Sequence, residues 1–294
     1  MAEIKKILIA NRGEIVQRAI RTIKEMGKKS VAVYSAGDKN ASYLKHADEA
    51  VCIGGAKSSE SYLNIPALIT AAEMTGCDAI FPGYGFLSEN QDFVEICKLH
   101  NIKFIGPSSE VMEKMADKSK AKEEMVRAGV PVVPGSKGAV RTLDEGKKIA
   151  REIGYPIMAK ASAGGGGRGM RLIKEEKDFD SQYLAASSEA LAAFGDGTMY
   201  LERFINNPRH IEVQVIGDSH GNAIHIGERD CSLQRRHQKV IEESPAILLN
   251  DETRAKLHEV AVKATKYLKY EGAGTFEFLA DDKQNIYFME MNTR

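Results

Sequence analysis

The chain has 294 residues, and its 41 basic and 41 acidic side chains give a formal net charge of zero. That balance argues against a protein that wraps nucleic acid or binds membranes through a polybasic surface, because both carry a large basic excess. No apolar run approaches about 18 residues and the N-terminus lacks a signal-peptide core, so we expect neither a membrane span nor a secretory leader. The length predicts roughly two domains. Four cysteines without metal-ligand spacing indicate a reducing compartment, the cytoplasm.

The first third of the chain alternates strand and helix patterns. Repeated strand–helix units imply an α/β fold with a parallel, doubly wound sheet and helices on both faces. Strands are expected over residues 6–10, 30–34, 50–53, 79–81 and 103–105, and helices over residues 14–26, 65–74 and 92–99. One charged helix is expected to follow over residues 109–128.

The remainder of the chain predicts a small mixed unit and then antiparallel hairpins. Residues 143–204 read as helix, strand, loop, strand, helix and strand. Alternating polar and apolar residues then predict a hairpin over residues 210–216 and 222–227. A helix over residues 251–268 precedes the last hairpin, residues 274–279 and 286–294.

A glycine-rich segment, residues 161–170, joins two expected strands. It contains the spacing GxGxxG, but a dinucleotide fingerprint requires a helix after the last glycine, and a strand is expected here. Bare backbone amides in such a flap can fold over phosphates. Lys160, at the end of the entering strand, would add a positive charge beside them. The alternative is a flexible surface hairpin with a solvated lysine.

Two acidic residues oppose each other in the last hairpin. If the turn spans residues 281–285, Glu277 falls opposite Glu290, and like charges directly across a ladder destabilise it. A divalent cation would remove that conflict, and two carboxylates with an amide suit Mg²⁺ or Mn²⁺. The alternative is a solvated polar face. That face also carries Thr275, Asn292 and Arg294, and the opposite face is expected to bury Phe276, Phe278, Met289 and Met291.

Residues 228–239 are too polar for a core and too short, without an aromatic residue, for a nucleic-acid patch. Their Arg, His, Lys and Gln side chains suit a small anion, and a solvated loop is an equally good interpretation. Residues 199–205 form an apolar strand that could provide a floor for a flat adenine ring.

These segments together resemble biotin carboxylase, an enzyme of the ATP-grasp superfamily, over Ile7 to Arg294. The resemblance is very specific because the matching segments occur in the same order along nearly the whole chain. They are residues 10–15, 81–90, 154–156, 160–162, 164–170, 207–210, 228–232, 234–239, 272–278 and 290–294. The resemblance implies an N-terminal parallel-sheet domain (residues 1–114), a helical linker (115–131), a lid with the glycine loop (132–204) and the first part of an antiparallel ATP-grasp body (205–294).

The resemblance also implies the reaction. ATP and bicarbonate would form carboxyphosphate, with Mg²⁺ or Mn²⁺, and CO₂ would pass to biotin on a carrier protein. Implied partners are the biotin carboxyl carrier protein, carboxyltransferase subunits of acetyl-CoA carboxylase or a related enzyme, and a second copy in a full-length homodimer. Implied catalytic residues are Lys239 and Arg294, which would bind bicarbonate and stabilise the biotin enolate. Implied metal ligands are Glu277, Glu290 and Asn292. Implied ATP-binding residues are Lys118, Lys160, Gly165, Gly166, Gly167, Glu202, Phe204, Ile205, His210, Gln234 and His237.

One departure from the family pattern bears on activity. In the family, the strand that carries Arg294 continues into Gln-Val-Glu-His, whose glutamate is the expected base for bicarbonate, and this sequence ends before it. We therefore expect a truncated chain with impaired turnover. The sequence also has no carrier domain with an Ala-Met-Lys-Met site, so biotin would arrive on another protein. The alternatives are another ATP-grasp ligase such as a carbamoyl-phosphate synthetase half, an ATP-binding module without turnover, and a Rossmann dehydrogenase.

Overall fold

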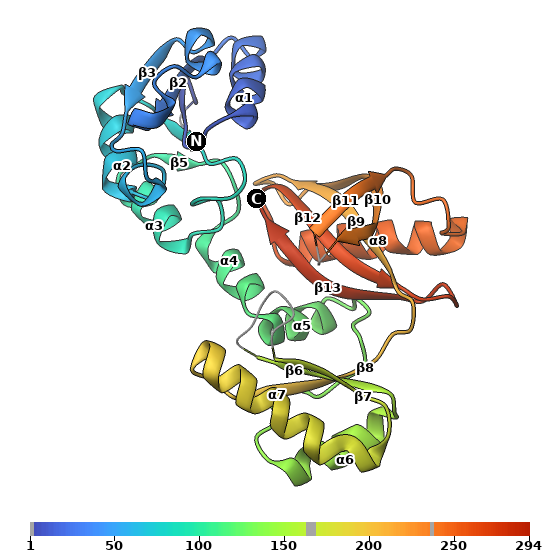
Figure 1. Cartoon of the computed structure of the whole chain (residues 1–294). Coiled ribbons are helices and arrows are strands. Elements are labelled where there is room, and N and C mark those ends of the chain that lie inside the picture. The colour runs from blue at the N-terminus through green and yellow to red at the C-terminus, as the bar shows by residue number, and fades with distance from the viewer. Residues whose placement is uncertain (1–2, 163–168, 236–237) are drawn as a thin grey trace.

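The computed structural model describes residues 3–162, 169–235 and 238–294, apart from the side chain of Ser119. Three sheets form three regions, and two short helices connect the N-terminal region to the other two (Figure 1). Within the described residues, no helix combines the length and the apolar character that crossing a bilayer requires.

The N-terminal region has the predicted parallel sheet, with strand order β3-β2-β1-β4-β5. Successive side chains of a strand point to opposite faces, so Ile7 and Ile9 pack against α1 while Leu8 packs against the helices on the other face. The sheet is therefore doubly wound, as predicted. Its elements are β1 (Lys6–Ile9), α1 (Glu14–Glu25), β2 (Lys29–Tyr34), β3 (Glu49–Cys52), α2 (Ile65–Met74), β4 (Ala79–Phe81), α3 (Gln91–Leu99) and β5 (Lys103–Phe104), with short 3₁₀ turns η1 (Ala36–Asp38), η2 (Ser42–His46) and η3 (Ser58–Glu60).

The prediction of one helix over residues 109–128 is wrong. The segment forms α4 (Ser109–Ala116) and α5 (Lys118–Arg127), separated by Asp117. Asp117 is extended, and its side chain accepts a hydrogen bond of 2.8 Å from the Lys120 backbone amide. An aspartate in that position caps a new helix, which turns the chain and brings α5 against the last strand of the body.

The lid has the predicted order of helix, two strands, helix and strand. Its three strands pair antiparallel in the order β7-β6-β8 and bury their apolar residues against two helices. The elements are α6 (Leu143–Ile153), β6 (Ile157–Ala161), β7 (Met170–Ile173), η4 (Glu176–Asp178), α7 (Phe179–Phe194) and β8 (Met199–Arg203).

The body is a five-stranded antiparallel sheet with strand order β11-β10-β9-β12-β13. One face packs on α8 and on part of α5, through Phe276, Phe278, Leu257 and Met125. The opposite face carries polar side chains and turns toward the lid. The elements are β9 (Arg209–Gly217), β10 (Ala223–Arg235), β11 (Gln238–Glu243), α8 (Asp251–Tyr267), β12 (Gly272–Ala280) and β13 (Ile286–Thr293).

The hairpin predicted to end at residue 227 is longer than expected. β10 runs on to Arg235, so most of the polar stretch is strand and not a solvated loop. Each acidic residue finds a basic partner: Glu228 lies 2.9 Å from Arg254 Nε, and Asp230 lies 2.9 Å from Arg209 Nε. Because these charges are paired, the strand can bury them.

The last hairpin has the predicted register with one irregularity. Glu277 pairs with Glu290, but a bulge follows, so that Phe278 pairs with Phe288. The prediction that Met289 packs in the core is therefore wrong, because the bulge puts Phe288 there. An extra residue on one strand shifts every following side chain by one position.

Candidate active site

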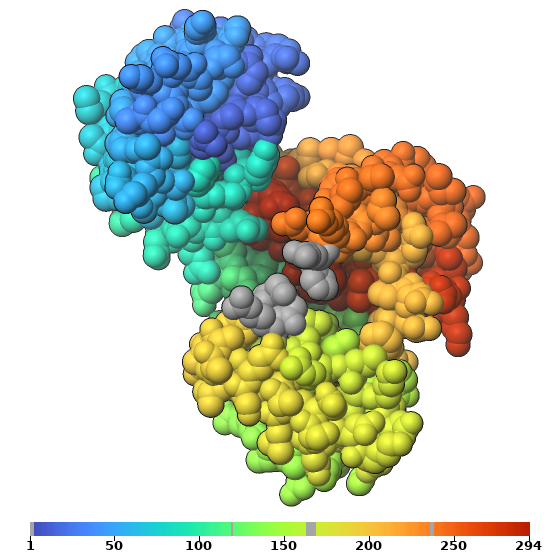
Figure 2. All heavy atoms as spheres, in the orientation of Figure 1, coloured from blue at the N-terminus to red at the C-terminus, as the bar shows by residue number. Residues whose placement is uncertain are grey.

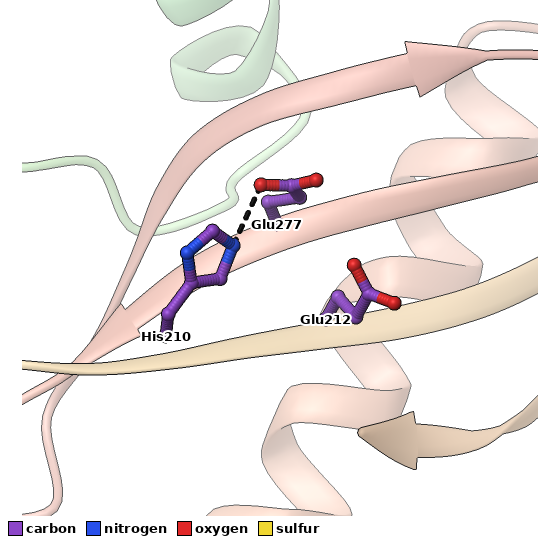
Figure 3. A group of neighbouring side chains, drawn as sticks. All are labelled: His210, Glu212 and Glu277. Carbon is purple, nitrogen blue, oxygen red and sulfur yellow. Dashed lines mark ion pairs between the residues drawn. The ribbon is translucent and has the colours of Figure 1, made fainter. Parts of the chain in front are cut away.

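Three glutamates form a row across the polar face of the body. Glu212 on β9 pairs in register with Glu277 on β12, and Glu277 pairs with Glu290 on β13. Figure 3 shows Glu212 and Glu277 leaving neighbouring strands on the same side of the sheet. Like charges directly opposite each other destabilise a sheet, so this row requires cations.

Basic side chains surround the two buried members of the row. Lys239 Nζ lies 2.9 Å from Glu277 Oε1 and also contacts Glu212. His210 Nε2 lies 2.6 Å from Glu277 Oε2 (Figure 3). Arg229, the register partner of Glu212 on β10, contacts the Glu212 carboxylate. The group is therefore a continuous network of ion pairs, in which Lys239 and Arg229 also donate hydrogen bonds.

This network keeps its carboxylates ionised. Burial by itself would raise the pKa of Glu277, but hydrogen bonds from His210 and Lys239 lower it to about 2. The pKa of Glu212 is lowered in the same way, against its burial, by Lys239 and Arg229. Burial would lower the pKa of Lys239, and the two carboxylates raise it above its usual value. Glu277, Glu212 and Lys239 are therefore charged at neutral pH.

Glu290 is more open than the other two glutamates. Its side chain is 40% exposed, and its carboxylate lies 3.7 Å from Lys118 Nζ of α5. Asn292, on the same strand, donates a 2.6 Å hydrogen bond from Nδ2 to Glu277 Oε1. The predicted metal ligands Glu277, Glu290 and Asn292 therefore lie together, and their oxygen atoms are the type that Mg²⁺ or Mn²⁺ prefers.

A different set of ligands lies closer together. Ligand atoms of His210, Glu212 and Glu277 lie within 4.8 Å of one another. However, Lys239 and Arg229 already neutralise this group. We therefore favour the side of the row with Glu290, where carboxylate charge is accessible, as the site that fits a hard cation.

On the lid side, one buried carboxylate contacts two lysines. Glu202 of β8 is contacted by Lys160 of β6 and by Lys122 of α5. Next to it, the Phe204 backbone amide donates a 3.0 Å hydrogen bond to Pro156 O, and Ile205 is buried. Lys160, Glu202, Phe204 and Ile205 were predicted from the sequence, and Lys122 was not. Its signal was its position one helical turn after Lys118, which puts both side chains on one face of α5.

A pocket of about 490 Å³ lies where the N-terminal region meets the body. Arg294, Thr275 and Gln214 line it from the body, and Tyr84 lines it from the loop after β4. Asn11 holds that loop, donating hydrogen bonds of 2.7 Å to Pro82 O and 2.8 Å to Tyr84 O. Because the carboxyl ends of β1 and β4 meet at the point where the strand order reverses, this is where an open parallel sheet places ligands.

The structure brings most of the predicted site residues into three groups. Gln234 joins the glutamate network, with Nε2 2.9 Å from His210 Nδ1. Arg294 lines the pocket at the N-terminal region together with Gln214, which accepts a 3.3 Å hydrogen bond from Arg229 of the network. Gly165, Gly166, Gly167 and His237 lie outside the described residues. The sequence analysis did not name Glu212, Arg229, Lys122, Tyr84 or Asn11 as site residues. Glu212 could have been found, because it lies between His210 and Gln214 on the same face of the predicted strand.

Figure 2 shows the dark-red surface of the C-terminal strands between the N-terminal region and the lid. Lys118 of α5 contacts Glu290 on the polar face of the body, and Lys122 of the same helix shares Glu202 of the lid with Lys160, so α5 joins the two sheets. A small sheet facing a larger antiparallel sheet, with carboxylates on one side and lysines on the other, defines the ATP-grasp class of nucleotide-binding proteins.

Comparison with protein-family models agrees with the ATP-grasp class and identifies a family within it. Residues 117–294 match the family described as "Carbamoyl-phosphate synthase L chain, ATP binding domain", and residues 3–112 match "Biotin carboxylase, N-terminal domain". The biotin carboxylase of Nostoc sp. is 56% identical over 98% of this chain. The chain belongs to the biotin carboxylase family.

Solved structures show the same similarity. A crystal structure described as a biotin carboxylase–β,γ-ATP complex from Campylobacter jejuni is 70% identical over 99% of this chain, with a TM-score of 0.90. The biotin carboxylase domain dimer of Hydrogenobacter thermophilus 2-oxoglutarate carboxylase, in complex with MgADP, ADP and bicarbonate, is 51% identical over the whole chain, with a TM-score of 0.87. This chain spans 65% of the Nostoc protein, 66% of the Campylobacter chain and 65% of the Hydrogenobacter chain.

Proposed function

We propose that this chain binds ATP, Mg²⁺ (or Mn²⁺) and bicarbonate for the ATP-dependent carboxylation of biotin on a carrier protein. The observation that supports this best is the pairing of Lys118 with Glu290 between α5 and β13. A phosphate-binding lysine and a metal-binding carboxylate must lie this close together if both are to act on one triphosphate.

Phosphoryl transfer requires little covalent chemistry from the protein, so catalysis rests on positioning and charge neutralisation. In this proposal, Lys118 and Lys160 bind the phosphates, and Glu202, Phe204 and Ile205 surround the adenine. Gly165, Gly166 and Gly167 would supply backbone amides to the phosphates. His210, Gln234 and His237 contact the ribose and phosphate side of the nucleotide.

A bound Mg²⁺ would be held by Glu277, Glu290 and Asn292, and would clamp the phosphate oxygens and act as a Lewis acid. Lys239 and Arg294 would bind bicarbonate and carboxyphosphate through their positive charges. Exclusion of water by the lid protects carboxyphosphate from hydrolysis until CO₂ is released beside biotin.

We further propose that the ureido ring of biotin enters the pocket lined by Arg294 and Tyr84. The Arg294 guanidinium beside that ring would stabilise the negative charge that develops when biotin becomes an enolate. The flat tyrosine ring gives the apolar ring system a surface to pack against.

The proposed domains are the N-terminal parallel-sheet domain (residues 1–114), the helical linker (115–131), the lid (132–204) and the first part of the ATP-grasp body (205–294). The proposed partners are a biotin carboxyl carrier protein, carboxyltransferase subunits and, in the full-length protein, a second copy of the chain. A cytoplasmic location is supported by four free cysteines, since disulfides are rare in a reducing compartment.

The experiment is bicarbonate-dependent ATP hydrolysis by the 294-residue chain, measured with and without free biotin, alongside calorimetric binding of MgATP. Biotin-stimulated hydrolysis that Arg294→Ala removes, with MgATP affinity unchanged, is the expected result. Binding of MgATP without any hydrolysis would contradict the carboxylation proposal for this chain. Failure to bind MgATP would overturn the nucleotide site as well.

A further inference from the structure

Glu202 is a buried carboxylate shared by two lysines from different parts of the chain. Its side chain is only 5% exposed, and the ammonium groups of Lys160 and Lys122 both contact it. The same two ammonium groups lie over the Tyr200 ring, at 5.2 Å for Lys122 and 5.9 Å for Lys160 from its centroid. The carboxylate therefore connects the linker helix α5 to the lid sheet.

The two lysines are not equivalent in the proposed function. Lys160 is the residue proposed to bind phosphate, and it extends from the strand that enters the glycine loop. When ATP binds, Lys160 must weaken its contact with Glu202. A buried carboxylate that loses its partner is strongly destabilised, so the cost of ATP binding depends on what else neutralises Glu202.

We propose that Lys122 is a positioning residue that keeps Glu202 neutralised while Lys160 turns to the nucleotide. This inference rests on the proposed ATP-binding role of Lys160. Without Lys122, Lys160 is the remaining cation in contact with Glu202 among the described residues. It would then be retained on the carboxylate, and ATP would have to compete with Glu202 for it.

Positive charge is in excess in this cluster. Burial, followed by repulsion from Lys160 and Lys118, lowers the pKa of Lys122 to about 7. Three ammonium groups therefore crowd a site in which Glu202 and Glu290 are the neighbouring carboxylates. A triphosphate supplies the missing negative charge, which favours a state in which Lys160 and Lys118 face ATP and Lys122 stays with Glu202.

The test is MgATP binding by calorimetry for Lys122→Met, with Lys120→Met as the matched control. Lys120 lies on the same helix with a 60% exposed side chain, 3.5 Å from Glu113 and away from Glu202. We expect Lys122→Met to raise Kd about ten-fold and Lys120→Met to leave it within about two-fold. An unchanged Kd for Lys122→Met would overturn the inference.

A double-mutant cycle with Glu202→Gln separates positioning from direct contact. With no buried carboxylate to retain Lys160, adding Lys122→Met to Glu202→Gln should change Kd by less than about two-fold. A loss as large as in the wild-type background would show that Lys122 binds ATP itself, and would also overturn the inference.

Two further controls separate a folding defect, and a failure of the proposed function, from the role of Lys122. Should Lys122→Met fail to fold by circular dichroism, Lys122→Gln, which keeps a hydrogen-bond donor, is measured in its place with the same expected direction. If the unmodified chain fails to bind MgATP, the proposed function is wrong. If it binds and Lys122→Met binds equally well, only the role of Lys122 is wrong.

Discussion

Glu277 and Glu290 face each other across the β12–β13 ladder, yet different parts of the protein neutralise them. Glu277 is held by His210 and Lys239 within the body, whereas Glu290 lies beside Lys118 of the linker helix. The two glutamates therefore differ in what they support. Glu277 belongs to a buried network of the body, and Glu290 connects the body to the helix that approaches the lid.

The first prediction concerns Glu290→Gln. Because the side chain is 40% exposed and its ion pair is long, the substitution should change the free energy of unfolding by less than about 1 kcal/mol. It should weaken MgATP binding by about ten-fold, since a metal ligand is lost, while metal-free ATP binding changes little. Calorimetry with and without Mg²⁺ measures both, and Asp282→Asn in the exposed turn of the same hairpin is the control. Equal MgATP affinity in the variant and the wild type would refute the metal assignment.

The second prediction concerns the pH dependence of nucleotide binding. Burial and the neighbouring Lys118 lower the pKa of Lys160 to about 8, and Lys122 has a pKa of about 7. These ammonium charges are present below those values and are lost as pH rises. Affinity for MgATP should therefore fall between about pH 7 and pH 9, and binding near pH 8 should take up protons, because phosphate stabilises the ammonium form. Calorimetry in buffers of different ionisation enthalpy measures the uptake; an affinity that is constant over this range would contradict it.

The third prediction concerns the loop that presents Tyr84. Gly83 and Gly85 have φ angles of +68° and +69°, but an added Cβ at Gly83 would lie 3.0 Å from Asn11 Nδ2, whereas Gly85 has no neighbour within 4 Å. Both alanine variants carry the backbone strain, and only Gly83→Ala also crowds the Asn11 side chain. We expect Gly83→Ala to lose about 1 kcal/mol more than Gly85→Ala in urea unfolding. Equal losses would show that Asn11 can move without cost.

The fourth prediction concerns acid stability of the N-terminal region. Hydrogen bonds from Arg12, and then from Tyr62, lower the pKa of Asp38 to about 2, against the effect of burial. A carboxyl whose folded-state pKa is lowered stabilises the protein above its unfolded value, near 3.8, and that contribution is lost as pH falls toward 2. Because Arg12 is half exposed, the contribution at neutral pH should be about 1 to 2 kcal/mol.

Urea unfolding of Asp38→Asn between pH 7 and pH 2.5 or so measures this contribution. The variant should be less stable than the wild type at pH 7, and the difference should shrink at the acid end. A difference that stays constant with pH would mean that the stabilisation comes from packing and not from the charge of Asp38.

Local pattern determined a large part of this protein. The continuous apolar run Ile7, Leu8 and Ile9 predicts a strand that is buried on both faces, and in the structure helices cover both faces of the sheet. The predicted pairing of Glu277 with Glu290 is confirmed, but the turn over residues 281–285 does not set it: a regular ladder from that turn would pair Glu277 with Met289, and the bulge beside Phe278 brings Glu290 opposite Glu277. Short-range chemistry is sufficient for the buried strand, whereas the register of the hairpin depends on a bulge that the turn does not specify.

The environment of charged residues was harder to predict, because it depends on partners that are distant in the sequence. Asp230 lies in a stretch that is compatible with a solvated loop, and it is buried because Arg209 pairs with it from the neighbouring strand. The helix over residues 109–128 breaks because Asp117 caps its second half. Helical periodicity does not reveal such a break, since the flanking residues continue the pattern.

The sequence by itself therefore determined the order of the three regions and the family to which the chain belongs. Only the tertiary structure decided that Glu212 stands beside Glu277 and that Lys122 shares Glu202 with Lys160. The pairing of β9 with β12, and the packing of α5 against the lid, join segments far apart in the chain. Their register depends on how whole surfaces pack, and no local periodicity contains that information.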